Sequence, residues 1–340
     1  MCNDQLDRVL FDLMDSYGHA ARFHGIYAST VCPMTADGAI AYRDLESHIG
    51  EVAGCGGLKG LLINGHAGEN AMLEREEARE VVATARRVAP RSLIVAGVNA
   101  ESSRNAVLLA EDAAAAGADA ILVFAPFSWI VGVDARTVVN HHRAIHDATD
   151  LPLMLFQGSV NSGKLWFPPE TLAALVHLPR VVGIKEGSWE TSAYEISRRV
   201  VRETRPGVAV MASGDEHLLS SFVLGSEGSL VSLAAVVPQL IVALDLAVRA
   251  GDMAAARACH DRIYPLARTV YGTGPAGLVS ARLKACLEIL GRIDSAYCRP
   301  PTAALPAEEI AALTNALEAA GELTKIGSAR PVPAAVGAAP

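Results

Sequence analysis

The stretch VVGIK, residues 181–185, is one of eight short apolar runs that decide the fold. Such runs recur every 20–35 residues, and each is continuous rather than alternating with polar residues. Continuous apolar runs are typical of strands buried on both faces of a parallel sheet. The eight runs are GIYASTVCP (25–33), LKGLLIN (58–64), SLIVAGV (92–98), DAILVFAP (119–126), LPLMLFQ (151–157), VVGIK (181–185), VAVMAS (208–213) and GSLVSL (228–233).

Amphipathic segments separate these runs and predict helices. EREEAREVVATARRVA (74–89) places apolar residues at helical spacing, DARTVVNHHRAIHDAT (134–149) begins with a capping residue, Asp134, and FPPETLAALVHL (167–178) begins with prolines. Gly117 is expected to end the helix before the fourth run. Eight strands alternating with helices predict an α/β fold, a (β/α)8 TIM barrel. The alternative is an open, doubly wound sheet. It is less favoured because no GxGxxG turn follows the first predicted strand of this chain.

The domain organisation follows from where this alternation starts and stops. We expect an N-terminal extension over 1–23, the barrel over 24–233 and a C-terminal helical region, an appendage, over 234–324. The tail over 325–340 is rich in Ala, Pro and Gly and is expected to be disordered.

Composition excludes several classes of protein. The net charge of −8 and the absence of basic blocks argue against a nucleic-acid partner. No apolar run approaches the roughly 18 residues of a membrane helix, and the acidic N-terminus does not resemble a signal peptide. The six cysteines are scattered without CxxC spacing, which favours free thiols over disulfides or a zinc site. We therefore expect a soluble cytoplasmic protein without a metal.

Lys185 is the residue in the runs that points to chemistry. Of five lysines in the chain, it alone ends an apolar strand. Barrel enzymes carry their sites at the carboxyl ends of the strands, where a partly desolvated amine can be neutral and nucleophilic and a guanidinium cannot. The alternative is a lysine that merely extends from a strand end into solvent.

Four motifs together resemble the dihydrodipicolinate synthase and N-acetylneuraminate lyase family. They are GHAGEN (65–70), LEREE (73–77), GIKE (183–186) and SGDE (213–216), and the similarity runs from about His24 to Ile289. The resemblance implies a lyase that needs no organic cofactor and forms a Schiff base between Lys185 and a 2-oxo acid such as pyruvate. It further implies a homo-oligomer, a tetramer or a dimer. Backbone N–H groups of Gly65, His66 and Ala67 would hold the substrate carboxylate, and the carbonyl of Leu230 would face the imine.

The chain departs from the family at the end of the fifth strand. The family usually has a proton-shuttling tyrosine there, whereas this chain reads Phe156-Gln157, and Asn161 stands at the position of an arginine found in the diaminopimelate-pathway synthases. These departures argue against dihydrodipicolinate synthase itself. His66 is the expected replacement acid or base because an imidazole titrates near neutrality, unless it only shapes the turn. Further candidates for substrate contact are Phe156, Gln157, Asn161 and Ser213.

Several functions stay open at this point. The missing phenol favours elimination, of the dehydratase or deaminase type, over aldol cleavage or condensation. A barrel that binds a 2-oxo acid without turning it over is one alternative. A phosphosugar enzyme using Gly225-Ser226-Glu227-Gly228 as a phosphate loop is another, although Glu227 would repel phosphate. His142 and His146 have the i, i+4 spacing of a metal pair but are expected to have a surface or core role.

Overall fold

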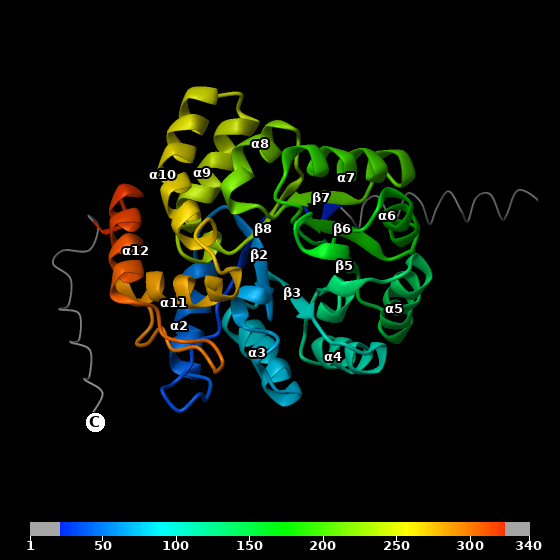
Figure 1. Ribbon diagram of the computed structural model, residues 1–340, viewed down its shortest axis with the longest axis horizontal. Helices are drawn as coiled ribbons and strands as arrows, with labels where there is room; N and C mark the ends of the chain where they lie inside the picture. The colour runs from blue at the N-terminus through cyan, green and yellow to red at the C-terminus, as the bar shows by residue number, and fades with distance from the viewer. Residues whose placement is uncertain (1–20, 324–340) are drawn as a thin grey trace, which may run out of the picture.

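A computed structural model describes residues 21–323 of the chain as a closed barrel of eight parallel strands in sequence order. This confirms the predicted (β/α)8 TIM barrel, and each predicted run coincides with one strand, β6 extending one residue further, to Glu186 (Figure 1). The strands are β1 (Gly25–Ser29), β2 (Leu58–Ile63), β3 (Leu93–Val98), β4 (Ala120–Val123), β5 (Leu153–Gln157), β6 (Val181–Glu186), β7 (Ala209–Ala212) and β8 (Gly228–Val231).

Within residues 21–323, seven helices connect these strands and four more follow the barrel. The connecting helices are α2 (Tyr42–Ala53), α3 (Arg75–Val88), α4 (Ser103–Ala115), α5 (Ala135–Ala148), α6 (Pro169–Val176), α7 (Thr191–Thr204) and α8 (Leu218–Val223). The C-terminal helices are α9 (Pro238–Arg249), α10 (Met253–Tyr271), α11 (Val279–Ile289) and α12 (Ala307–Ala319). Short 3-10 turns after the strands matter for the site: η1 (His66–Gly68), η2 (Phe127–Val131) and η4 (Asp215–His217).

Local signals in the sequence explain where the helices begin and end. Helix α3 starts with a capping box in which Glu74 and Glu77 bond each other's backbone. The Asp134 carboxylate accepts the Thr137 N–H at 2.9 Å, and Pro169 occupies the first turn of α6. Gly117 adopts φ +93° just beyond α4, a left-handed conformation that favours glycine. All four helix signals predicted from the sequence are confirmed.

Two apolar cores support the barrel. One fills its interior with side chains such as Tyr27, Leu62, Met154 and Leu230, and the other lies between the strands and the surrounding helices. Strand residues contribute to both cores, so β4, β6, β7 and β8 are buried along their whole length. This two-sided burial explains why the runs read as continuous rather than alternating.

The C-terminal helices gather along one side of the barrel, where α9 packs on α8 and α10 (Figure 1). Helix α11 lies against η1, and the Ser280 hydroxyl donates to the His66 carbonyl at 3.0 Å. The helical region therefore reaches the carboxyl ends of the strands. The predicted tail, 325–340, and nearly all of the predicted extension, 1–23, lie outside the described residues.

Within residues 21–323, none of the helices combines the length and apolar character that crossing a bilayer demands.

Candidate active site

Lys185 lies at the carboxyl end of β6 with only 7% of its surface exposed. Its Nζ is 5.9 Å from the centroid of the Phe124 ring and 5.8 Å from that of Phe156. In the sheet, Lys185 stands opposite Phe156 of β5 on one side and Met211 of β7 on the other. The side chain is therefore held among apolar groups at the mouth of the barrel, where the sequence places it.

Burial lowers the pKa of the Lys185 amine to about 8, while the negative charge of Asp215 acts in the opposite direction. Desolvation penalises the ammonium because water no longer stabilises its charge. About a tenth of the amine is then neutral at pH 7, far more than for an exposed lysine. This is the condition that a nucleophilic amine requires.

Asp215 is the carboxyl group that interacts electrostatically with Lys185. It belongs to η4, is 3% exposed, and accepts the Leu233 N–H at 2.9 Å. Burial raises the pKa of Asp215 to about 7, opposed by the Leu233 hydrogen bond, by Lys185 and by the Tyr271 hydroxyl. A carboxyl group that titrates near neutrality beside the amine can both accept and return a proton.

The turn after β2 carries the residues expected to form the backbone cradle. Gly65 caps η1 and His66 and Ala67 are its first residues, and the first N–H groups of any helix lack partners within it. A side chain at Gly65 would lie 2.8 Å from the Ser29 hydroxyl, so the close packing of β1 requires glycine there. The turn can therefore present neutral donors to a carboxylate.

Glu69 stabilises this turn through contacts with the C-terminal region of the chain. Its backbone is left-handed (φ 56°), its carboxylate forms an ion pair with Lys284 of α11, and the Arg299 N–H donates to it at 3.2 Å. The Lys284 side chain is fully buried and the Glu69 side chain nearly so. The C-terminal helical region thus supports the turn after β2 through a buried ion pair.

His66 lies among three phenylalanine rings rather than in a polar setting. Its ring centroid is 4.2 Å from that of Phe124, 5.5 Å from Phe156 and 5.7 Å from Phe127. These apolar surroundings, together with the positive charge of Lys185, lower the pKa of His66 well below its ordinary value. The expectation that this imidazole titrates near neutrality is therefore corrected: it is held neutral and can bond as donor or acceptor.

The remaining candidates lie in different surroundings. Gln157 is fully buried, and its amide both donates to and accepts from the backbone of Phe167, at 3.0 and 2.9 Å, so its polar atoms are engaged in the fold. Asn161 is exposed in the loop after β5. Ser213 follows β7 at the same barrel end as Lys185, and Leu230 lies inside the barrel opposite Tyr27.

Glu186 follows Lys185 but its carboxylate is turned towards α7. It accepts hydrogen bonds from the hydroxyls of Ser188 (3.0 Å) and Ser197 (3.1 Å). Burial raises its pKa to about 7, and the serine hydrogen bonds oppose this shift. Its bonds to α7 give it a supporting role.

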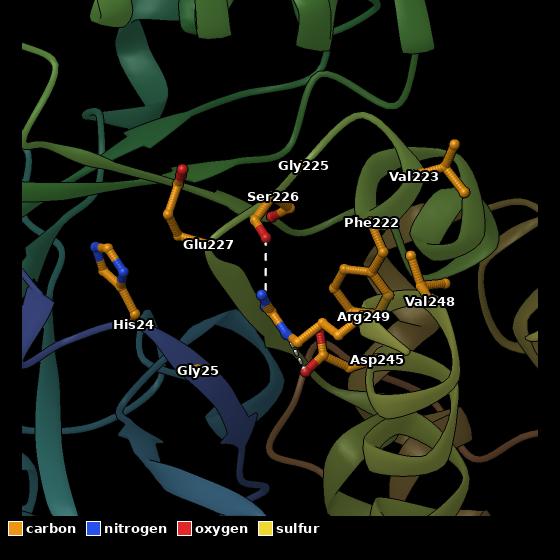
Figure 2. A pocket seen from close by; sticks show the side chains of 10 residues that line it. All are labelled: His24, Gly25, Phe222, Val223, Gly225, Ser226, Glu227, Asp245, Val248 and Arg249. Carbon is orange, nitrogen blue, oxygen red and sulfur yellow. Dashed lines mark hydrogen bonds and ion pairs between the residues drawn. The ribbon is translucent and has the colours of Figure 1, made fainter. Parts of the chain in front are cut away.

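A cavity of about 710 Å³ lies at the opposite end of the barrel from Lys185 (Figure 2). It opens between the start of β1 at Gly25, the loop before β8 and helix α9, where Arg249 bridges Asp245 (2.8 Å) and the Ser226 carbonyl (3.4 Å). The Gly225–Gly228 segment thus precedes a strand instead of following one. Its Glu227 carboxylate is bound by Arg202 and the Val210 N–H. The interpretation of this segment as a phosphate loop is therefore wrong.

The described part of the chain contains no group of three or more His, Cys, Asp or Glu residues placed to hold a metal ion. His142 is buried, and its Nδ1 bonds the Val138 carbonyl at 2.9 Å. The expectation of a mechanism without metal or organic cofactor stays a prediction.

A lysine ending a barrel strand, beside a backbone cradle, defines a class of protein: the Schiff-base-forming lyases. The family description "Dihydrodipicolinate synthetase family" matches residues 22–320, and the chain belongs to this family of lyases. One relative, 4-hydroxy-tetrahydrodipicolinate synthase 1 of Streptomyces coelicolor, is 32% identical over 89% of this chain and 95% of its own length. The enzyme of the same activity from Hyphomonas neptunium is 31% identical over 78% and 89%.

Solved structures of this family have the same fold. The Escherichia coli K12 prophage protein YagE, solved in complex with pyruvate, superposes with a TM-score of 0.81 at 25% identity, covering 88% of this chain and 99% of that one. A putative dihydrodipicolinate synthetase from Pseudomonas aeruginosa gives 0.79 at 28% identity, with the same coverage.

Proposed function

We propose that Lys185 forms a Schiff base with C2 of pyruvate or of a larger 2-oxo acid. The observation that carries this proposal is the burial of a lysine amine at a barrel strand end, between two phenylalanine rings, with its pKa lowered to about 8. The cradle of Gly65, His66 and Ala67 supplies N–H donors for the substrate carboxylate. Leu230 contributes the strand-8 carbonyl near the imine.

The chemistry follows from the groups at the mouth. The neutral amine attacks the ketone carbon, water leaves, and the protonated imine withdraws electrons from C3. A base can then remove a C3 proton to give an enamine. Because Phe156 has no acidic proton, we assign this transfer to Asp215, the buried carboxyl group with a pKa of about 7.

Borohydride trapping tests this function. Incubation with pyruvate and borohydride should add the mass of the reduced adduct to the peptide that contains Lys185, and Lys185→Arg should remove it. Release of deuterium from C3-labelled pyruvate should accompany the adduct. An adduct on another lysine contradicts the proposal. An adduct without exchange favours the alternative of a protein that binds 2-oxo acids without converting them.

Because Phe156 replaces the tyrosine that is usual in the family, a second reaction is also proposed: elimination of water or ammonia from a substituted 2-oxo acid. Release of water or ammonia with all carbon atoms retained in one unsaturated or deoxy 2-oxo acid would establish it. We also place the protein in the cytoplasm as a homo-oligomer, a tetramer or a dimer. The exposed Val223 and Leu246 support association, which light scattering tests directly.

A further inference from the structure

Four aromatic rings form a continuous cluster at the mouth of the barrel: His66, Phe124, Phe127 and Phe156. Phe124 and Phe156 touch each other, with centroids 5.0 Å apart, and both also touch His66. Phe127 extends the cluster outward from η2 and stacks on His66 at an interplanar angle of 27°. We call this set the aromatic cluster.

The aromatic cluster is connected to the reacting amine and is open to solvent. Phe124 and Phe156, which touch His66, are also the two rings nearest to the Lys185 Nζ. Phe124 is buried, Phe156 is partly buried, and His66 and Phe127 are exposed, Phe127 by 42%. The rings therefore lead from the amine to the surface.

The placement of these rings is unusual for this chain. Only 5% of its residues are Phe, Trp or Tyr, and three of its seven phenylalanines surround one histidine. Sites for small molecules are lined mostly by apolar and aromatic side chains, and this set beside the Lys185 amine has that composition. Glu101, the carboxylate beside Phe127, is occupied by the N–H groups of Phe127 (2.8 Å) and Ser128 (3.1 Å).

The chemistry of the aromatic cluster selects what can lie beside it. None of its four rings carries a charge, since the imidazole is held neutral. A polyhydroxylated or anionic chain placed against phenyl rings would lose hydrogen bonds to water without replacing them. A flat aromatic group would instead gain stacking and edge-to-face contacts.

We propose that the substrate carries an aromatic ring on C4, so that the protein cleaves a 4-aryl-4-hydroxy-2-oxo acid to pyruvate and an aryl aldehyde, or joins the two. This inference rests on the proposed Schiff-base function. The aryl group lies against Phe127, Phe156 and His66, while the pyruvyl carbon atoms lie at Lys185.

The bonds and protons balance without an oxidant or reductant. Lys185 Nζ replaces the C2 oxygen, which leaves as water, and the C3–C4 electron pair moves into the iminium as that bond breaks. The C4 hydroxyl proton passes to the Asp215 carboxylate, and the aldehyde departs. Asp215 then gives this proton to C3 of the enamine, and water hydrolyses the resulting imine to release pyruvate.

A comparison of aldehydes tests the inference. Pyruvate is offered with benzaldehyde, glyceraldehyde or succinic semialdehyde, and product formation is followed chromatographically. We expect kcat/KM for benzaldehyde to exceed that for the two aliphatic aldehydes by at least about tenfold. Phe127→Ala should raise the KM for benzaldehyde about three- to tenfold and that for glyceraldehyde less than twofold. Val131→Ala, on the same 3-10 turn and 92% exposed, is the matched control and should change neither.

Each other outcome has a definite meaning. Equal or greater use of glyceraldehyde or the semialdehyde overturns the aromatic substrate. A Phe127→Ala protein with altered oligomeric mass but unchanged aldehyde preference assigns that ring to contact between copies and also overturns it. Trapping with pyruvate alone, in the same preparation, separates the two proposals. If the adduct forms but aromatic aldehydes are not preferred, only the aromatic substrate is overturned. If no adduct forms, the Schiff-base function is overturned as well.

Discussion

Phe156 and Lys185 stand opposite each other in the register of β5 and β6, with the Nζ 5.8 Å from the ring centroid. An aromatic ring at this position is thus placed beside the reacting amine whether or not it carries a hydroxyl. The phenyl ring desolvates the amine and faces the ammonium or iminium charge, an interaction that stabilises cations. It cannot carry a proton.

Restoring the hydroxyl should restore proton transfer. Phe156→Tyr is expected to speed the exchange of the C3 protons of bound pyruvate by about a hundredfold, the lower end of what a positioned acid or base contributes. Nuclear magnetic resonance of pyruvate in deuterium oxide measures this rate. Phe156→Leu, which adds no hydroxyl, serves as control. An unchanged rate in the tyrosine variant would show that proton transfer runs wholly through other groups.

Formation of the Schiff base should depend on pH through the Lys185 amine. Because its pKa is lowered to about 8, the trapping rate should rise from pH 6 to pH 9 with a midpoint near 8. The negative charge of Asp215 raises the pKa of Lys185, so Asp215→Asn should move the midpoint to lower pH. Rapid trapping at a series of pH values gives both curves. A midpoint above 10 would mean that the amine is not desolvated.

Removing the buried charge should stabilise the fold at neutral pH. The folded pKa of Lys185 lies below its unfolded value of 10.5, so burial of the ammonium costs stability below pH 8, and this cost disappears as the pH rises towards 10.5. Lys185→Met should therefore raise the free energy of unfolding at pH 7 by up to about 3 kcal/mol, and by less at pH 9.5. Urea unfolding at the two values measures the difference. A loss of stability at pH 7 would contradict this account.

The buried ion pair between Lys284 and Glu69 should be costly to break on one side. Lys284→Met leaves the Glu69 charge without its partner and is expected to lower the free energy of unfolding by about 3–5 kcal/mol. The double variant Lys284→Met with Glu69→Leu removes both charges and should recover much of the loss. Because Glu69 holds the cradle, the single variant should also raise the KM for the 2-oxo acid. Equal stability of single and double variants would show that the pair is uncoupled.

Gln157 should prove important for stability rather than for substrate contact. Gln157→Leu leaves the N–H and carbonyl of Phe167 without partners, which is expected to cost about 2–4 kcal/mol. The exposed Asn161→Ala should change stability by less than about 0.5 kcal/mol. Thermal unfolding compares the two. A Gln157 variant with normal stability and a large increase in KM would assign it to the substrate instead.

The sequence predicted the barrel well because each strand is buried on both faces, which leaves an unbroken apolar run. The sequence also predicted Lys185 as the nucleophile, because lysine is rare in this chain and because active-site residues of barrels lie at the carboxyl ends of strands. Both signals are local, and local signals are what a single sequence carries.

The features that the sequence did not reveal depend on distant contacts. Glu69 and Arg299 are 230 positions apart, and nothing near Lys284 indicates that its charge is buried. The neutral state of His66 results from Phe124 after β4, Phe127 in η2 and Phe156 in β5. Asp215 lies in a motif visible in the sequence, but its raised pKa comes from burial in the folded barrel, against the hydrogen bonds of Leu233 and Tyr271.

The contacts of Lys284 and Arg299 with Glu69 have a consequence for biosynthesis. A ribosome that has finished all eight strands has not yet supplied the Lys284 ammonium and the Arg299 backbone N–H that hold Glu69 after β2. A nascent chain halted near residue 235 should therefore hold pyruvate poorly even if its strands have closed. The chain would therefore become able to bind pyruvate only late in translation, once the final helices have emerged and docked.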